Sequence, residues 1–315
     1  MQSYRSVKMI DLPAEYQDRK TEFDKAIEEV LRKGDFIKGK AVIDFEQAFS
    51  TYLGTKHVIS CGNGTDALQI ALMASGIKKG DEVILPAFSY VAVIEVVCLL
   101  KAKPVLVEVD PVFFQIEPKS VSDAITDRTR AIIPVHLFGQ CGNMTEILQI
   151  AEQHNLYVIE DAAQAIGASY KNRKLGTLGH IGCTSFFPTK NLACYGDGGA
   201  VITDDDDIAE RIRMIASHGQ RRKYHHEILG VNSRLDTIQA AILNVKLKYL
   251  DDNLAIKKAV AERYLADLQG IGQILTPEQH PSVSHSWHQF TIRAKDGSRD
   301  SLKDWLKNKG VDSMI

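Results

Sequence analysis

HVISCGNGTDALQIALMASG, residues 57–76, contains the structural unit from which the fold can be predicted. The first five residues, HVISC, are apolar and β-branched, which is typical of a buried strand. Gly62 and Gly64 predict a turn, and TDALQIALMASG predicts a helix that opens at Thr65 and Asp66. A strand followed at once by a helix is the repeating unit of α/β folds.

The same alternation continues through the first two thirds of the chain. Further short apolar runs bounded by turn residues predict strands: EVILP (82–86), KPVLVEV (103–109), RAIIPVHLF (130–138), LYVIED (156–161), CTSFFP (183–188) and GAVIT (199–203). Helical patterns separate most of them: VAVIEVVCLLKA (91–102), PKSVSDAITDR (118–128) and MTEILQIAEQHN (144–155). We therefore predict an α/β fold with a mostly parallel central sheet and helices on both of its faces.

The two ends of the chain have different patterns. Residues 14–33 predict one amphipathic helix that stops at Gly34, and residues 236–269 predict a long helical segment with a polar face. The last part, with SWHQFTIRAK (286–295) and SLKDWLKNKG (301–310), predicts a small α+β unit. We expect a large domain over residues 1–249 and a small one over residues 250–315.

Composition excludes several classes of protein. The chain has 315 residues, 44% of them hydrophobic and 25% charged, with a net charge of −2. These values are typical of a soluble globular protein and give no sign of a nucleic-acid or membrane partner. The five cysteines are odd in number and show no CxxC spacing, which favours free thiols in the reducing cytoplasm over disulfides or a zinc site.

Two stretches suggest binding of a small ligand. The glycine turn before Thr65 leaves free backbone N–H groups at a helix N-terminus, which can bind an anion, although an ordinary helix cap explains the same residues. No P-loop lysine is present there, and GDGG (196–199) leads into a strand, unlike a dinucleotide-binding motif. Asp161 ends an apolar strand, where ligands of α/β sheets collect, but it also suits a helix cap.

Lys190 follows an apolar run and precedes a glycine-rich loop, so we expect it to be half-buried. Partial burial lowers the pKa of an amine toward the neutral form that attacks a carbonyl group. Ser185 could bind an anion beside it. An anion cradle, an acid at a strand end and a half-buried lysine together match what pyridoxal 5'-phosphate requires for its phosphate, ring nitrogen and aldehyde.

Other polar residues suit structural roles better. The run Asp204 to Asp207 predicts a turn that caps the next helix, because consecutive carboxylates cannot easily converge on one metal ion. We therefore predict no metal site. His136 is better explained as a structural histidine.

At the level of motifs, the sequence resembles the DegT/DnrJ/EryC1/StrS sugar aminotransferases, which are fold-type I enzymes that use pyridoxal phosphate. The matching motifs run nearly end to end: GDFIKG (34–39), NGTDAL (63–68), GDEVILPAFSYVA (80–92), RTRAIIPVHLFGQ (128–140), EDAAQAIGASYK (160–171), SFFPTKNL (185–192), GDGGAV (196–201) and GVNSRLDTIQAAIL (230–243).

The resemblance implies a role for each matched residue. Lys190 would form a Schiff base with the cofactor and then move the substrate proton, and Asp161 would pair with the ring nitrogen. Gln164 would contact the ring hydroxyl and Tyr90 would stack on the ring. The phosphate would be held by Gly64, Thr65 and Ser185, and by Asn232 from a neighbouring subunit, so that a homodimer would share its active sites.

The resemblance also implies a reaction. Because family dehydratases carry histidine where this chain has Lys190, transamination is favoured, from L-glutamate through pyridoxamine 5'-phosphate to a keto group of a nucleotide sugar. The segment 217–243 is most similar to the subgroup that aminates C3 of UDP-linked 2-acetamido-3-keto-glucuronic acid for bacterial surface polysaccharides. Arg234 would bind the uronate carboxylate, and Gly34, Phe36 and Thr189 match positions that line the nucleotide-sugar pocket.

Three alternatives stay open at this point. The substrate could be a neutral dTDP- or UDP-linked keto-deoxysugar aminated at C3 or C4. The chain could be a non-catalytic regulatory protein that binds pyridoxal phosphate, since fold does not fix function. The basic cluster Arg221, Arg222, Lys223, His225 and His226 could meet a pyrophosphate, but a solvated loop explains it better. Because family members usually continue beyond Ile315, we expect the small domain to be incomplete in this sequence.

Overall fold

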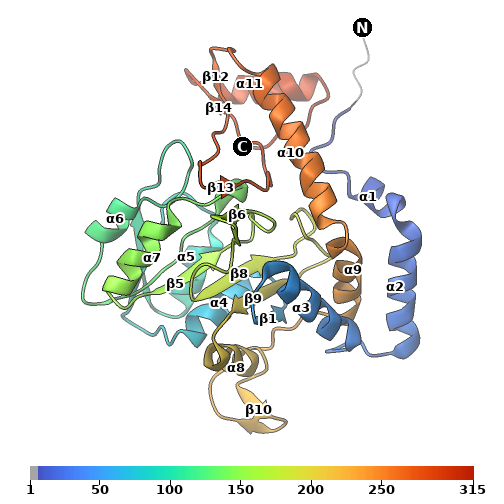
Figure 1. Ribbon diagram of the computed structural model, residues 1–315, viewed down its shortest axis with the longest axis vertical. Coiled ribbons are helices and arrows are strands. Elements are labelled where there is room, and N and C mark those ends of the chain that lie inside the picture. Colours follow the sequence, from blue (N-terminus) through green and yellow to red (C-terminus); the bar gives the residue numbers. More distant parts are fainter. Residues whose placement is uncertain (1–5) are drawn as a thin grey trace.

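A seven-stranded sheet forms the centre of the computed structural model, which describes residues 6–315 (Figure 1). The strand order is β1-β9-β8-β5-β4-β2-β3. The strands are β1 (His57–Cys61), β2 (Glu82–Pro86), β3 (Lys103–Val107), β4 (Thr129–Ile132), β5 (Tyr157–Asp161), β8 (Ile181–Ser185) and β9 (Gly199–Thr203). Only β9 runs antiparallel to its neighbours, β1 and β8. The predicted mostly parallel sheet is therefore confirmed.

Helices cover both faces because successive strand residues point in opposite directions. Along β2, Val83 and Leu85 pack in a cluster with helices α4 (Gly64–Ala74), α5 (Ala92–Leu99) and α8 (Asp206–Ile215). Between them, Ile84 faces a second cluster with α6 (Pro118–Asp123) and α7 (Met144–Gln153). A third cluster joins β1 and β9 to α3 (Lys40–Leu53).

The predicted strand over residues 130–138 is too long. Strand β4 ends at Ile132, and residues Leu137–Gly139 form the 3₁₀ turn η1. Pro134 has no N–H to donate to the neighbouring strand, which ends the regular ladder there. Only an isolated bridge between Val135 and Asp161 continues it.

Two predicted long helices are each broken in the structure. Residues 12–33 form α1 (Leu12–Asp18) and α2 (Lys20–Lys33), because Arg19 takes φ −132° between them; Gly34 ends α2 at φ +72° as predicted. Residues 236–269 form α9 (Thr237–Leu247) and α10 (Leu250–Asp267). Helix α9 is mostly buried against α2 and α3, so the predicted polar face is wrong for this part and holds only for α10.

Helix α10 leads from the sheet to the C-terminal elements (Figure 1). These are β12 (Ile274–Leu275), β13 (Val283–Ser284), β14 (Arg293–Ala294) and α11 (Arg299–Asn308). Strand β13 pairs with β6 (Ser169–Tyr170), which also pairs with β7 (Arg173–Lys174). The C-terminal part therefore returns to the loop that follows β5, and the division at residue 249 stays a prediction.

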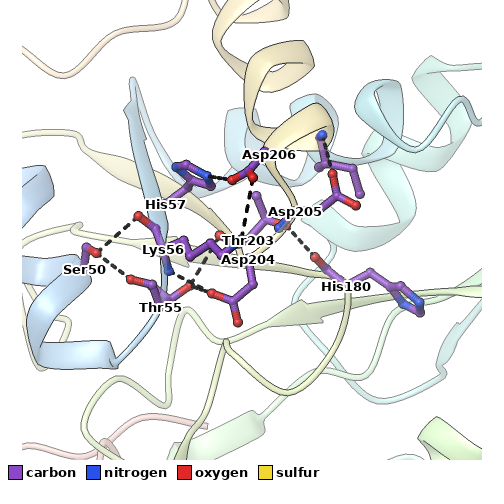
Figure 2. A network of polar contacts seen from close by, with 10 residues as sticks. Ser50, Thr55, Lys56, His57, His180, Thr203, Asp204, Asp205 and Asp206 are labelled. Carbon is purple, nitrogen blue, oxygen red and sulfur yellow. Dashed lines mark hydrogen bonds and ion pairs between the residues drawn. The ribbon is translucent and has the colours of Figure 1, made fainter.

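Three consecutive aspartates make separate polar contacts beside β1 and α8 (Figure 2). Asp204 accepts hydrogen bonds from Thr55 Oγ1 and the Lys56 N–H, both at 2.8 Å. Asp205 caps α8 by accepting from the Ile208 N–H at 2.9 Å, and Asp206 lies 2.7 Å from His57 Nε2. The predicted turn and helix cap are thus present, and the carboxylates point apart.

Two further features concern the surface. A hairpin of β10 (Gln220–Arg222) and β11 (His225–His226) projects beside α8 and carries the basic cluster, whose residues are exposed (Figure 1). Among the helices of residues 6–315, none is long and apolar enough to cross a membrane.

Candidate active site

Lys190 lies in the loop between β8 and β9, and its side chain is half-buried as the sequence predicts. Its backbone N–H donates to the Phe187 carbonyl at 2.9 Å, which fixes a tight turn after the strand. Burial lowers the pKa of the Lys190 amine, and the negative charge of Asp161 opposes that shift. The amine therefore reaches the neutral, nucleophilic form more easily than an exposed lysine does.

Asp161 is the last residue of β5 and is only 8% exposed. Burial raises the pKa of its carboxyl group, while the Ala163 N–H at 3.0 Å and the charge of Lys190 act in the other direction. The residues after Asp161 form turns, so the helix-cap interpretation is wrong here. Among residues 6–315 no cationic side chain lies within ion-pair distance of this buried carboxylate, and Lys190 acts on it only from farther away. A protonated ring nitrogen can supply a close cation.

The anion cradle is formed by the start of α4 and the end of β8. Helix α4 begins at Gly64, one residue before the predicted opening, and Thr65 and Asp66 lie in its first turn. Its cap is Asn63, whose Oδ1 accepts from the Asp66 N–H at 2.8 Å, so a cap role for Thr65 or Asp66 is wrong. Gly64 is the first helical residue, and a Cβ placed on it would lie 2.7 Å from Ser185 Cβ. The first residue of α4, Gly64, thus lies directly beside Ser185, which brings the N-terminus of the helix and a hydroxyl group together.

Ser233 stabilises this cradle and was missed from the sequence. Its buried hydroxyl accepts from the Gly62 N–H at 2.8 Å and donates to Asp66 Oδ2 at 2.5 Å. The flanking residues Asn232 and Arg234 alternate with it along an extended segment, so their side chains are exposed. The structure therefore brings Asn232 and Arg234 to the rim of the cradle with side chains open to solvent.

The N-terminal loop runs beside the segment that follows Arg234. The Phe36 carbonyl accepts from the Thr237 N–H at 2.9 Å, and Ile37 bridges to Asp236. Gly34 is the left-handed cap of α2, and the Phe36 side chain is 46% exposed. The predicted substrate residues Gly34, Phe36 and Arg234 thus come from two segments that lie side by side.

The remaining predicted residues are Gln164, Thr189 and Tyr90, and they differ in burial and in hydrogen bonding. Gln164 Oε1 accepts from the Phe138 N–H at 2.7 Å, which leaves its NH₂ group to donate to a ligand. Thr189 precedes Lys190 and is partly buried. Tyr90 is 68% exposed, and within the described residues its ring stacks on no other ring.

Residues from the C-terminal part of the chain also border the site. Ser286 donates its N–H to the Gly139 carbonyl at 2.9 Å and accepts from Asn191 Nδ2 at 3.3 Å. Burial lowers the pKa of His288 to about 3, and the charges of Lys190 and Lys257 add to that effect. The sequence predicts the SWHQF stretch only as part of a small α+β unit, because nothing local shows that it returns to the lysine loop.

The residues present fit pyridoxal phosphate. They supply an amine of lowered pKa, a buried carboxyl group, an amide donor, and a cradle of helix N–H groups with a hydroxyl. The five cysteines, by contrast, are free and stay outside this set, and burial raises the pKa of Cys61, Cys141, Cys183 and Cys194.

Comparison with known proteins gives consistent matches. The model of the DegT/DnrJ/EryC1/StrS aminotransferase family matches residues 17–315. "UDP-2-acetamido-2-deoxy-3-oxo-D-glucuronate aminotransferase" of Pseudomonas aeruginosa is 47% identical over 309 residues, 98% of this chain and 85% of that protein. A "Pleiotropic regulatory protein" of Geobacillus stearothermophilus is 46% identical over 312 residues, 98% and 83%. The crystal structure of S. venezuelae DesV in complex with a ketimine intermediate matches with a TM-score of 0.95 and 42% identity, covering 98% and 82%.

Proposed function

Since the chain belongs to the DegT/DnrJ/EryC1/StrS aminotransferase family, we propose that it moves an amino group from L-glutamate to a keto group of a nucleotide-linked sugar. The family membership predicted from the motifs is confirmed, as is the dependence on pyridoxal 5'-phosphate. One observation carries the proposal: a half-buried lysine of lowered pKa faces a buried carboxyl group beside an anion cradle.

The protein's own groups divide the work of the reaction. When bound, the cofactor supplies an electron sink conjugated to the substrate carbon. Lys190 Nζ takes the proton from the substrate carbon in the glutamate half of the reaction and delivers a proton to the sugar carbon in the other half. The lowered pKa of Lys190 favours this role at neutral pH. Asp161 would keep the ring nitrogen protonated, and Gln164 would donate to the ring hydroxyl. Gly64, Thr65 and Ser185 would hold the phosphate and thereby orient the ring.

For the acceptor, we propose C3 of UDP-linked 2-acetamido-3-keto-glucuronic acid, used in bacterial surface polysaccharides such as lipopolysaccharide O-antigen. The name of the Pseudomonas aeruginosa relative supports this choice. The physical support is Arg234, because an exposed guanidinium at the rim of the cradle suits a carboxylate through two parallel hydrogen bonds. Gly34, Phe36 and Thr189 would line the remainder of the nucleotide-sugar pocket.

We further propose a homodimer that shares its active sites in the cytoplasm. Large apolar side chains next to the site are exposed in the single chain: Phe88 at 50%, Tyr90 at 68%, Val91 at 49% and Phe187 at 49%. Such a patch supports an interface with a second copy. In that dimer Tyr90 would stack on the cofactor ring, and Asn232 would reach the phosphate of the cofactor bound to the partner subunit. The free thiols support a reducing compartment.

The first experiment is the absorption spectrum of the purified protein before and after addition of L-glutamate. We expect a yellow band from bound pyridoxal phosphate that glutamate replaces with the shorter-wavelength band of pyridoxamine phosphate. If added pyridoxal phosphate gives no band, the role of Lys190 is wrong. A band that glutamate leaves unchanged would favour the regulatory function suggested by the name of the Geobacillus stearothermophilus relative.

The second experiment separates a uronate from a neutral sugar. Arg234→Ala should lower kcat/KM for the UDP-linked keto-uronate by about 30-fold or more, because a desolvated charge pair loses one partner. Arg222→Ala in the exposed hairpin is the matched control and should have no effect. The alternative substrate would be established if wild type and Arg234→Ala both convert a neutral dTDP- or UDP-keto-deoxysugar at the same rate and neither converts the uronate.

A further inference from the structure

A second half-buried lysine, Lys257, lies close to the catalytic loop and has no role in the reaction described above. Lys257 is on α10, and burial lowers the pKa of its amine. Its Nζ donates to Asn191 Oδ1 at 2.6 Å. Within residues 6–315 no carboxylate lies within ion-pair distance of it. The charge of Glu15 acts on this half-buried ammonium group only from beyond ion-pair distance, so Asn191 is its close polar partner.

Asn191 is the residue directly after Lys190, and its amide group is fully used. The oxygen accepts from Lys257, while Nδ2 donates to the carbonyls of Ile166 and Ser286, each at 3.3 Å. Three segments distant in sequence therefore meet at one side chain: α10, the turn after β5, and the stretch before His288. A side chain held from three directions fixes the position of its own backbone and of the adjoining lysine.

The helix that carries Lys257 is itself firmly placed against the site. Leu254 lies one turn before Lys257 on the same face of α10. It packs against Gly167, which takes φ +94° and has no room for a side chain because of that contact. Helix α10 thus touches the turn after Asp161 through Leu254 and the loop of Lys190 through Lys257.

The backbone next to the contact between Ser286 and Asn191 is also held in a conformation of high energy. Trp287 and Phe138 both take positive φ, at +47° and +64°, and Gln289 donates its N–H to the Phe138 carbonyl. A Cβ on Gly139 would lie 2.7 Å from Ser286 Oγ and 3.0 Å from the backbone nitrogen of His288. Such local strain persists only where the surrounding contacts impose it, and it concentrates at functional sites.

From this geometry we propose that Lys257 is a positioning residue for Lys190. Its amine holds Asn191, and Asn191 holds the loop so that the Lys190 side chain stays half-buried. The link to catalysis rests on the proposed function, because a half-buried Lys190 is what makes the amine a competent base at neutral pH. Loss of the Lys257 contact lets water reach Lys190, which raises the pKa of Lys190 toward that of an exposed lysine.

The test measures the Lys190 amine itself in the full chain after removal of the cofactor. The rate at which acetic anhydride labels Lys190 is followed against pH by mass spectrometry, since only the unprotonated amine reacts. Lys257→Met keeps the apolar stem and removes the donor. We expect labelling of Lys190 at pH 8 to fall about three- to tenfold, because each unit of pKa changes the neutral fraction about tenfold. Lys257→Arg, which keeps a donor, should restore most of the rate.

Two comparisons control the result. Lys258→Met removes the adjacent lysine, which is exposed and pairs with Glu262 at 3.8 Å, and it should leave the labelling profile unchanged. Asn191→Leu should raise the pKa of Lys190 as Lys257→Met does, and the double variant should raise it no further, because both act through one contact. If Lys257→Met does not fold, Lys257→Gln takes its place in the same comparison of single and double variants.

An unchanged labelling profile in Lys257→Met would overturn the proposal. Additive shifts in the double variant would also overturn it, since they would mean that Lys257 acts directly through its charge. The labelling needs no cofactor. A wild-type protein that binds no pyridoxal phosphate would therefore refute the proposed function and leave the positioning result to stand or fall on its own.

Discussion

Gly64→Ala is the sharpest test of where the cofactor phosphate binds. Gly64 begins α4, and a Cβ on it would lie 2.7 Å from Ser185 Cβ and 3.3 Å from Ser185 Oγ. Carbon atoms in contact normally stay about 3.5–4.0 Å apart, so the helix start and the end of β8 must separate by about 1 Å. Neither atom can rotate away, because each Cβ is fixed to its backbone.

The expected magnitude follows from that displacement. Overpacking of this kind costs about 1–3 kcal/mol in the free energy of unfolding. A hydrogen bond to a charged phosphate contributes about 1.5–3 kcal/mol, and a shift of about 1 Å removes one such bond. The dissociation constant of pyridoxal phosphate should therefore rise by about 10- to 100-fold. The melting temperature of the cofactor-free protein should fall by several degrees.

The assay is a titration of the cofactor-free protein with pyridoxal phosphate, followed by absorbance, together with a thermal melt. Gly272→Ala is the matched control, because a Cβ there meets nothing within 4 Å. Ser185→Ala removes the hydroxyl without adding bulk, so it should weaken cofactor binding and leave the melt nearly unchanged. Wild-type cofactor affinity in both Gly64→Ala and Ser185→Ala would refute the placement of the phosphate at the start of α4.

Three further results are expected. Asp161→Asn should reduce turnover by about 100-fold or more. It should also raise the melting temperature of the cofactor-free protein at pH 7, because burial raises the pKa of Asp161 and its ionised form opposes folding at any pH above that value; a lower melting temperature would contradict this. Hydrogen bonds from Thr126, Arg128 and Lys103 hold the pKa of Glu82 at about 2, so this carboxylate stabilises the fold above its unfolded pKa, and that contribution is lost as pH falls from about 4.5 to about 2. Urea midpoints of Glu82→Gln should accordingly depend less on pH in that window than those of wild type. Asp205→Ala removes the cap of α8 drawn in Figure 2 and should cost about 1 kcal/mol by urea unfolding, and an unchanged midpoint would mean that the cap does not stabilise the helix.

Much of the fold could be predicted because short apolar runs carry strong local information. The bounds of β1, β2 and β9 match the predicted runs 57–61, 82–86 and 199–203. Errors occurred where a distant contact or a single residue interrupts a pattern. The break at Arg19 and the burial of α9 are examples, since α9 is covered by α2 and α3 from the other end of the chain.

The candidate site shows the same division. Lys190, Asp161 and Ser185 could be singled out because each stands at a strand end or beside a glycine-rich loop. Ser233 and Lys257 could not, since their importance comes from partners far away in the chain. Ser233 contacts Asp66, and Lys257 contacts Asn191.

The sequence by itself determined the strand–helix alternation, the reactive residue types and the family, because these depend on the order of neighbouring residues. Only the tertiary structure decided which contacts hold Lys190 in its half-buried position. Burial and pKa depend on every segment that packs against a side chain, including α10 and the stretch 286–289. Those contacts form only when the chain closes on itself, so no local pattern encodes them.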